Sequence, residues 1–151
     1  MSHITLRNKQ GVIGAWLIAL FYLLSILIVL VVMPTTGFDG SADAFHNASV
    51  ALPYAAEHPW LSLDILKDAL LATGLILLGV YLYASYAEKR LLPLALALVG
   101  AALALGSAIA GYTSLMIVID LWQEGVAEAE AAYLPVTLMA GGLRWASMIV
   151  S

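Results

Sequence analysis

Three side chains of types that bind metals lie in one polar segment of this chain, namely Asp43, His46 and His58. Asp43 and His46 are three positions apart, so on a helix their side chains would share one face. Imidazole nitrogen and carboxylate oxygen are ligands for transition metals, and His58 would supply a third donor. Solvated groups at a membrane surface explain the same spacing more simply. We therefore predict no metal site and keep these three residues as the candidate ligands.

Arg144 is an ionisable residue inside an apolar run. On insertion scales, placing an arginine at the centre of a transmembrane helix costs about 2.5–3.5 kcal/mol. Arg144 therefore needs a partner or a route to a polar surface. One hypothesis is a bound anion, a lipid head group or a carboxylate from a partner protein. The hypothesis we favour is that its long side chain extends to the head groups at the inner face. Trp145 beside it, and Trp60, are of the type that contacts lipid or a partner at a membrane interface.

The residue types that carry most enzyme and redox chemistry are either absent from the chain or expected outside the middle of its apolar runs. The chain has no cysteine, which excludes disulfides, thiolate metal sites and iron–sulfur clusters. We expect no histidine or carboxylate in the middle of an apolar run, where proton relays and haem ligation require them. No serine–histidine–aspartate arrangement or phosphate-binding glycine loop is present. We predict no enzyme activity, no resident cofactor and no nucleic-acid binding, although a lipid or pigment held by packing is compatible with the sequence.

The composition is that of a membrane protein, with 63% hydrophobic residues, 11% charged residues and a mean hydropathy of +0.98. About 20 consecutive apolar residues suffice for a helix to cross the hydrocarbon core. Four apolar runs are present, at 11–33, 63–86, 91–119 and 134–150. The fourth is the shortest, and it spans only if Arg144 reaches the inner face. The pattern predicts one membrane domain over 1–151, an all-α bundle of four transmembrane helices.

Three connections join these runs, with 34–62 and 120–133 on the outer side and 87–90 on the inner side. In the first connection Ser41 is a suitable N-cap, and Phe45 and Leu52 fall on one helical face. This pattern predicts a short interfacial helix in the first outer loop. Pro53 and Pro59 are expected to break the helical pattern, because proline lacks the amide N–H that a helix interior uses.

Small residues recur every four positions along one face of the third run, and two adjacent glycines lie in the fourth. They are Ala102, Gly106, Ala110, Ser114, Gly141 and Gly142. In lipid, helices gain little from burying apolar surface, and small residues instead allow their backbones to approach closely. We therefore expect these residues to pack helices together and the third run to be central to the bundle.

The basic residues predict the orientation, because Lys and Arg are retained on the cytoplasmic side of a membrane. With the N-terminus inside, five basic residues lie on the cytoplasmic side and one, Lys67, lies opposite. The five are Arg7, Lys9, Lys89, Arg90 and Arg144. Both termini are then cytoplasmic and the outer connections form an acidic face. The alanine-rich helices without cysteine suit a bacterial cytoplasmic membrane.

These features favour a non-catalytic accessory or scaffolding subunit that packs against other transmembrane proteins and lipids, in a respiratory, photosynthetic or transport assembly. A small oligomeric transporter or channel is the second hypothesis, in which the acidic outer face attracts cations. The third is a membrane-embedded enzyme acting on a lipid or quinone. It would use the tyrosines at the end of the second run with Glu88 and Arg90.

Overall fold

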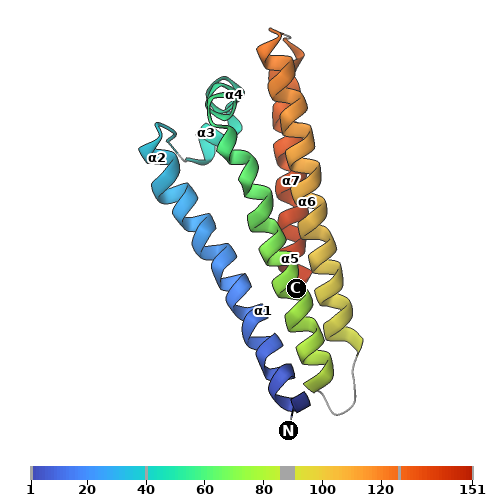
Figure 1. Cartoon of the computed structure of the whole chain (residues 1–151). Helices are drawn as coiled ribbons and strands as arrows, with labels where there is room; N and C mark the ends of the chain where they lie inside the picture. Colours follow the sequence, from blue (N-terminus) through green and yellow to red (C-terminus); the bar gives the residue numbers. More distant parts are fainter. Residues whose placement is uncertain (1, 40, 86–90, 126, 151) are drawn as a thin grey trace.

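A computed structural model describes residues 2–39, 41–85, 91–125 and 127–150 of the chain (Figure 1). None of these residues lies in a β-strand, so the predicted all-α fold class is confirmed over the described ranges. The elements in chain order are α1 (Ser2–Leu27), a π-helical segment (Ile28–Val32), α2 (Met33–Thr35), α3 (Ala42–His46), α4 (Ala48–Glu57), a 3₁₀ helix (Pro59–Leu63), α5 (Asp64–Ser85), α6 (Leu91–Gln123) and α7 (Glu128–Val150).

Three helical stretches of the described chain are long and apolar enough to cross a membrane. They are Asn8–Thr35, Pro59–Ser85 and Leu91–Gln123. These stretches correspond to the first three predicted spans. The predicted fourth span, 134–150, is part of α7 and is not among them. Helix α7 begins in an acidic turn with Glu128 and contains Arg144, so its apolar content is lower. Three candidate spans are therefore supported, and a fourth is not confirmed.

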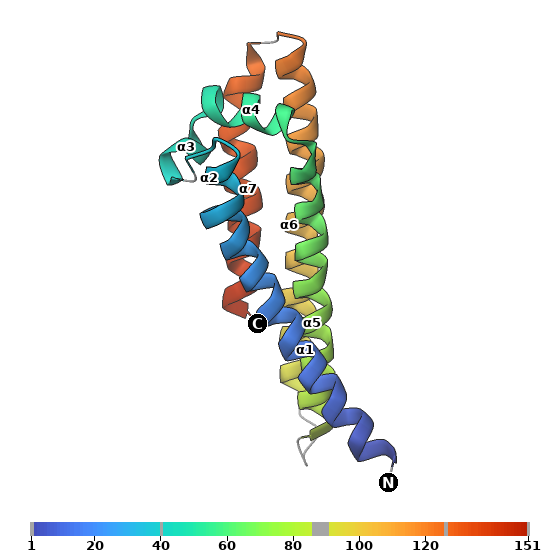
Figure 2. The ribbon, with the colours of Figure 1, turned by 60° about the vertical axis from the view of Figure 1, so that its left-hand side comes forward.

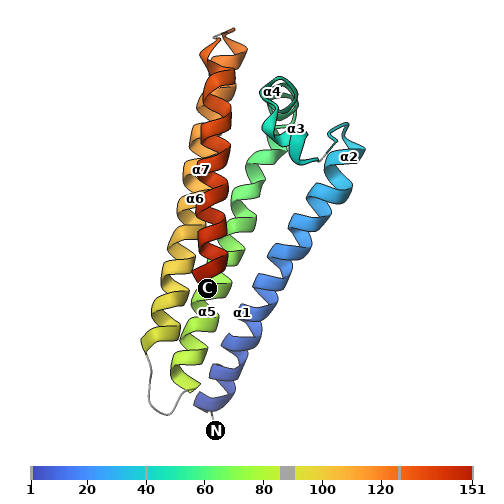
Figure 3. The same ribbon diagram turned by 180° about the vertical axis from the view of Figure 1, so that it is seen from behind.

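The long helices α1, α5, α6 and α7 lie side by side in chain order (Figures 1 and 3). Helix α1 packs against α5, α5 against α6, and α6 against α7. Helix α1 diverges from the other long helices toward the end of the molecule where α3 and α4 lie (Figures 1 and 3). Figure 2 shows α4 lying crosswise to the long helices, where it contacts α6 and α7. The short helices therefore lie at the end where α1 separates from the other long helices.

Glycines let α5 approach both of its neighbours. A Cβ atom built on Gly74 would lie 2.9 Å from the carbonyl oxygen of Gly14 on α1. A Cβ atom built on Gly79 would overlap the Cβ of Ala97 on α6. In lipid this close approach supplies the van der Waals contact that holds helices together. The closest packing of the bundle thus uses glycines of α1 and α5 that the sequence analysis did not select.

The buried face of α6 is made of small residues, but it is not the predicted ridge. Ala102 is exposed, Ala110 and Ser114 are only half-buried, and a Cβ built on Gly106 would meet nothing within 4 Å. The small residues of α6 that are buried are Ala97, Gly100, Ala101, Ala104, Ser107 and Ala108. Helix α6 is central as predicted, since it contacts α5 and α7, but it does so with a different face.

The first connection contains the predicted short helix in the form of two helices, α3 and α4. Ser41 caps α3 as predicted, because its Oγ accepts the amide N–H of Ala44 at 3.1 Å. Asn47 ends α3 and caps α4, because its Oδ1 accepts the amide N–H of Ser49 at 3.2 Å. The side chain of Asn47 competes with the helix for backbone hydrogen bonds, which explains the break between α3 and α4.

The two prolines of this connection behave differently. Pro59 opens the 3₁₀ helix after α4 has ended, in agreement with the prediction. Pro53 lies inside α4, so the prediction that it breaks the helix is wrong. The proline removes one helical hydrogen bond, and the burial of Leu52, which has 0% of its surface exposed, offsets that loss.

Tyr133 fastens α3 to α7. Its hydroxyl donates a hydrogen bond to the carbonyl oxygen of Phe45 at 3.0 Å, and the side chain is buried. Burial raises the pKa of Tyr133 above its ordinary value of 10.0, and a hydrogen bond with the Thr137 side chain opposes part of that rise. The phenol is therefore protonated at neutral pH and remains a donor to the α3 backbone.

Candidate functional site

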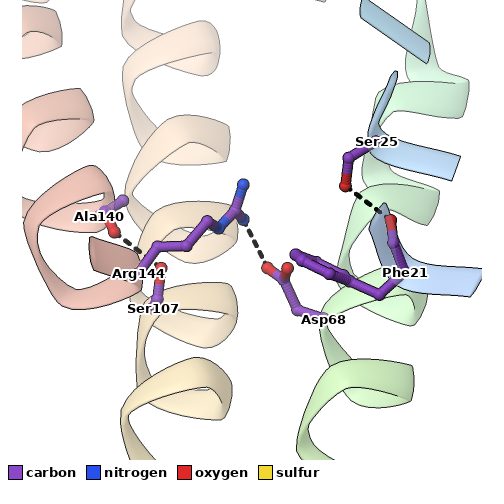
Figure 4. Close-up of polar contacts among 6 residues, drawn as sticks. All are labelled: Phe21, Ser25, Asp68, Ser107, Ala140 and Arg144. Carbon is purple, nitrogen blue, oxygen red and sulfur yellow. Dashed lines mark hydrogen bonds and ion pairs between the residues drawn. The ribbon is translucent and has the colours of Figure 1, made fainter. Parts of the chain in front are cut away.

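Arg144 of α7 and Asp68 of α5 form an ion pair in the interior of the bundle (Figure 4). The Nη2 atom of Arg144 donates to the Oδ2 atom of Asp68 at 2.5 Å. The Asp68 side chain is 3% exposed and that of Arg144 is 33% exposed. Our favoured prediction that Arg144 extends to the head groups at the inner face is wrong. Its guanidinium instead points across the bundle to a carboxylate of the same chain, because that carboxylate offsets the cost of keeping the charge inside.

The pair lies at the level of the middle of the first candidate span. The Nζ atom of Lys67 lies 5.4 Å from the ring centroid of Phe21, and Phe21 is midway along Asn8–Thr35. Asp68 follows Lys67 directly, and both side chains are buried. Asp68 lies toward the start of its own candidate span, Pro59–Ser85, yet the packing of α1 against α5 places it level with the middle of the first span. The sequence analysis considered each apolar run alone and did not predict this level. Asp68 is close to the start of α5, but α5 starts below the layer formed by α3 and α4 (Figure 1).

This placement also removes part of the argument for orientation. Arg144 was predicted at the inner face and Lys67 at the outer face. Arg144 instead bonds Asp68, which directly follows Lys67 in the chain, so the two cations lie at one level of the bundle. Lys9 is exposed near the start of α1. The side chains of Arg7, Lys89 and Arg90 lie outside the described part of the chain. The predicted location of both termini on the cytoplasmic side stays a prediction.

Two serines fix α7 against α6 on either side of Arg144. The Oγ of Ser107 donates to the carbonyl oxygen of Ala140 at 2.7 Å (Figure 4). The Oγ of Ser147 donates to the carbonyl oxygen of Gly100, also at 2.7 Å. Hydroxyl-to-carbonyl bonds between helices stabilise packing in an apolar interior by about 1 kcal/mol each. They hold the α7 backbone at the height from which Arg144 reaches α5.

A cavity of about 880 Å³ extends from this ion pair toward α3 and α4. Most of its wall is apolar and comes from α1, α5, α6 and α7. Aromatic side chains of the first connection line the end near α4, and these are Phe38, Tyr54 and Trp60. The opposite end carries the polar groups of Asp68, Arg144 and Ser107. Its volume lies within the range of about 300–1,000 Å³ typical of small-molecule sites.

The candidate metal ligands are not brought together. Asp43 and His46 are exposed on α3. The ring of His58 stacks on Tyr54 with centroids 4.1 Å apart, and its Nδ1 lies 2.8 Å from the Tyr54 carbonyl oxygen. Within the described residues, no group of three His, Cys, Asp or Glu side chains could hold a metal ion.

The predicted lipid or partner contacts divide into two groups. Trp60 is half-buried against the hydrophobic cluster that α3 and α4 form with α6 and α7, and its ring meets the His58 ring edge-on. Trp145 is 70% exposed. A Cβ built on Gly141 or Gly142 would meet nothing within 4 Å, and Gly141 lines the cavity. The two glycines therefore do not pack α7 closely against another helix of this chain.

The residues missed by the sequence analysis are Lys67, Asp68 and the two serines that brace α7. A signal for the ion pair was present, because Asp68 and Arg144 are opposite charges inside separate apolar runs and each is costly alone. Glu88 and Arg90, which the third hypothesis of a membrane enzyme would use, lie outside the described residues, so that hypothesis is not tested by the structure.

Comparison of the chain with protein-family models, with curated proteins and with solved structures found no match. The fold and the site therefore define the protein by class alone. It is an all-helical protein with three helices able to cross a membrane, an ion pair between α5 and α7, and an apolar cavity beside that pair.

Proposed function

We propose that the protein is a non-catalytic accessory or scaffolding subunit that packs against other transmembrane proteins in a larger complex. The observation that carries this proposal is that small residues on α6 and on α7 are left open by the other helices of this chain. Ala102 is exposed, and Gly106 on α6 and Gly142 on α7 face open space. Small residues on the outside of a membrane helix allow another helix to approach its backbone closely.

The buried ion pair supports a scaffolding role. It joins α5 to α7 across the bundle, and the serine bonds join α7 to α6. A rigid arrangement of these helices would hold the open surface of α6 and α7 in one shape. The charges at Asp68 and Arg144 neutralise each other, which is the arrangement expected of a structural pair.

Enlarging the open surface tests this proposal. We expect Gly106→Ile and Gly142→Leu to leave the chain folded and to raise the free energy of unfolding by up to about 1 kcal/mol, because nothing of this chain lies nearby and a side chain restricts the unfolded chain. Both variants should lose subunits that co-purify with the parent protein, measured by native mass spectrometry of protein taken from its own membrane. Trp16→Leu, at an exposed position of α1, is the matched control and should retain them. A parent protein that is monomeric in mild detergent, without any co-purifying subunit, contradicts the proposal.

A small oligomeric transporter or channel is the second candidate, and the observation that favours it is the presence of Lys67, Asp68 and Arg144 along a cavity at mid-span level. Ionisable residues inside membrane proteins commonly mark transport paths. Cation flux into proteoliposomes should then exceed that into protein-free liposomes, and the Asp68→Asn/Arg144→Gln double variant should abolish the excess. Equal flux with and without protein removes this candidate.

A further inference from the structure

We propose that the cavity between α1, α5, α6 and α7 binds a single-chain amphiphile with a carboxylate head group, and that Arg144 binds the carboxylate. The cavity has one polar end, at Arg144 and Asp68, and one aromatic end, beneath α4. A ligand that fills it must therefore be apolar over most of its length and polar at one end. This binding site is independent of the scaffolding role.

The charges lining the cavity favour an anion. Among the described residues of its wall, Lys67 and Arg144 are cations and Asp68 is the single carboxylate. A guanidinium has five N–H donors, so Arg144 can bond Asp68 through Nη2 and still donate to a second carboxylate. Attraction between charges is stronger in an apolar interior than in water. A cationic ligand would meet two positive side chains there.

Two hydroxyl groups near the polar end, those of Ser107 and Thr137, are already engaged within the protein. Ser107 donates to the carbonyl oxygen of Ala140, and Thr137 donates to the carbonyl oxygen of Tyr133 at 2.6 Å. These hydroxyls therefore hold α6 and α7 in place and offer no proton to a ligand. Arg144 has the most N–H donors of the side chains at this end, so it contributes most to recognition of the polar group of the ligand. The planar guanidinium matches the two oxygens of a carboxylate, which is why we infer a carboxylate head group.

Trp60 provides a local readout, because it lines the aromatic end of the cavity. Dibrominated stearic acid, whose bromine atoms quench tryptophan at short range, is the probe, and the dibrominated alcohol of the same chain is its neutral control. We expect saturable quenching by the acid with an affinity about tenfold or more above that of the alcohol, equivalent to one charge-assisted hydrogen bond. Trp60→Phe should remove the saturable component, whereas Trp16→Phe should retain it.

The charge requirement is tested with the Asp68→Asn/Arg144→Gln double variant, which removes both charges of the ion pair together and should fold. Its preference for the acid over the alcohol should fall well below that of the parent protein, because Lys67 is the one cation that it keeps among the described residues of the wall. Asp68→Asn alone, where it folds, should bind the acid more tightly than the parent protein, because Asp68 no longer competes for Arg144. Equal binding of acid and alcohol by the parent, or an acid preference that is undiminished in the double variant, overturns the proposal. Tighter binding of the corresponding alkyl phosphate overturns the assignment of the head group.

Discussion

Asp68→Asn is expected to lower the free energy of unfolding by about 3–5 kcal/mol, which is the usual cost of removing one partner of a buried ion pair. The variant leaves Arg144 inside the bundle without the carboxylate that its Nη2 atom contacts. Loss of the contact itself is the smaller part of this cost. The larger part is the uncompensated charge in an apolar interior. Unfolding in mixed micelles by a denaturing detergent, followed by circular dichroism, measures the difference.

The double variant Asp68→Asn/Arg144→Gln separates these two contributions. Replacing both charges of a buried pair by neutral groups is often nearly neutral for stability. The double variant should therefore be more stable than Asp68→Asn alone, and the two single effects should not add. Asp120→Asn, at an exposed carboxylate of α6, is the control and should change stability by less than about 0.5 kcal/mol. Additive effects of the two single substitutions would show that the residues are not paired.

The three candidate spans could be predicted from the sequence because each is a local property. The stretch Asn8–Thr35 is continuous and apolar, and length with hydropathy alone identifies it. The cap at Ser41 was predictable for the same reason, since the donor and acceptor are three residues apart. Where a few neighbouring residues decide the outcome, the sequence prediction and the structure agree.

The ion pair could not be predicted by the same reasoning, because its two residues are 76 positions apart. Asp68 lies near the start of the second apolar run, 63–86, which follows the predicted outer connection, so the sequence pattern places it near the outer surface. That assignment assumed that all helices begin at one membrane surface, whereas α5 begins beneath α3 and α4 (Figure 1). The depth of a charge in a bundle depends on how far its helices are shifted along one another. The sequence of a single apolar run does not give this shift.

The packing face of α6 was mispredicted for a related reason. The helix is apolar on all sides, and small residues recur on several of its faces. Ala97 and Ala101 repeat with the same spacing as Ala102 and Gly106. The close approach of Gly79 on α5 selects the face that contains Ala97. The choice between equivalent faces is therefore made by the neighbouring helix, and spacing within α6 cannot reveal it.

Gly79→Ala is expected to lower the free energy of unfolding by about 1–3 kcal/mol, the usual cost of overfilling a well-packed contact. Its new Cβ would overlap the Cβ of Ala97, so α5 and α6 would have to separate. Gly142→Ala, the same substitution where nothing lies within 4 Å, should instead stabilise the protein by about 0.4–1 kcal/mol, because alanine restricts the unfolded chain.

The second substitution Ala97→Gly decides whether the contact with Gly79 is the cause. It removes the one Cβ that the new side chain of Gly79→Ala would overlap, so the pair Gly79→Ala/Ala97→Gly should recover most of the lost stability. Ala97→Gly alone should be destabilising by about 1 kcal/mol, since glycine costs that much in a helix. Rescue of one destabilising change by another is expected only if the two residues touch. Without that rescue, α5 and α6 do not pack through this glycine, and the small-residue face that is open on α6 must be assigned again.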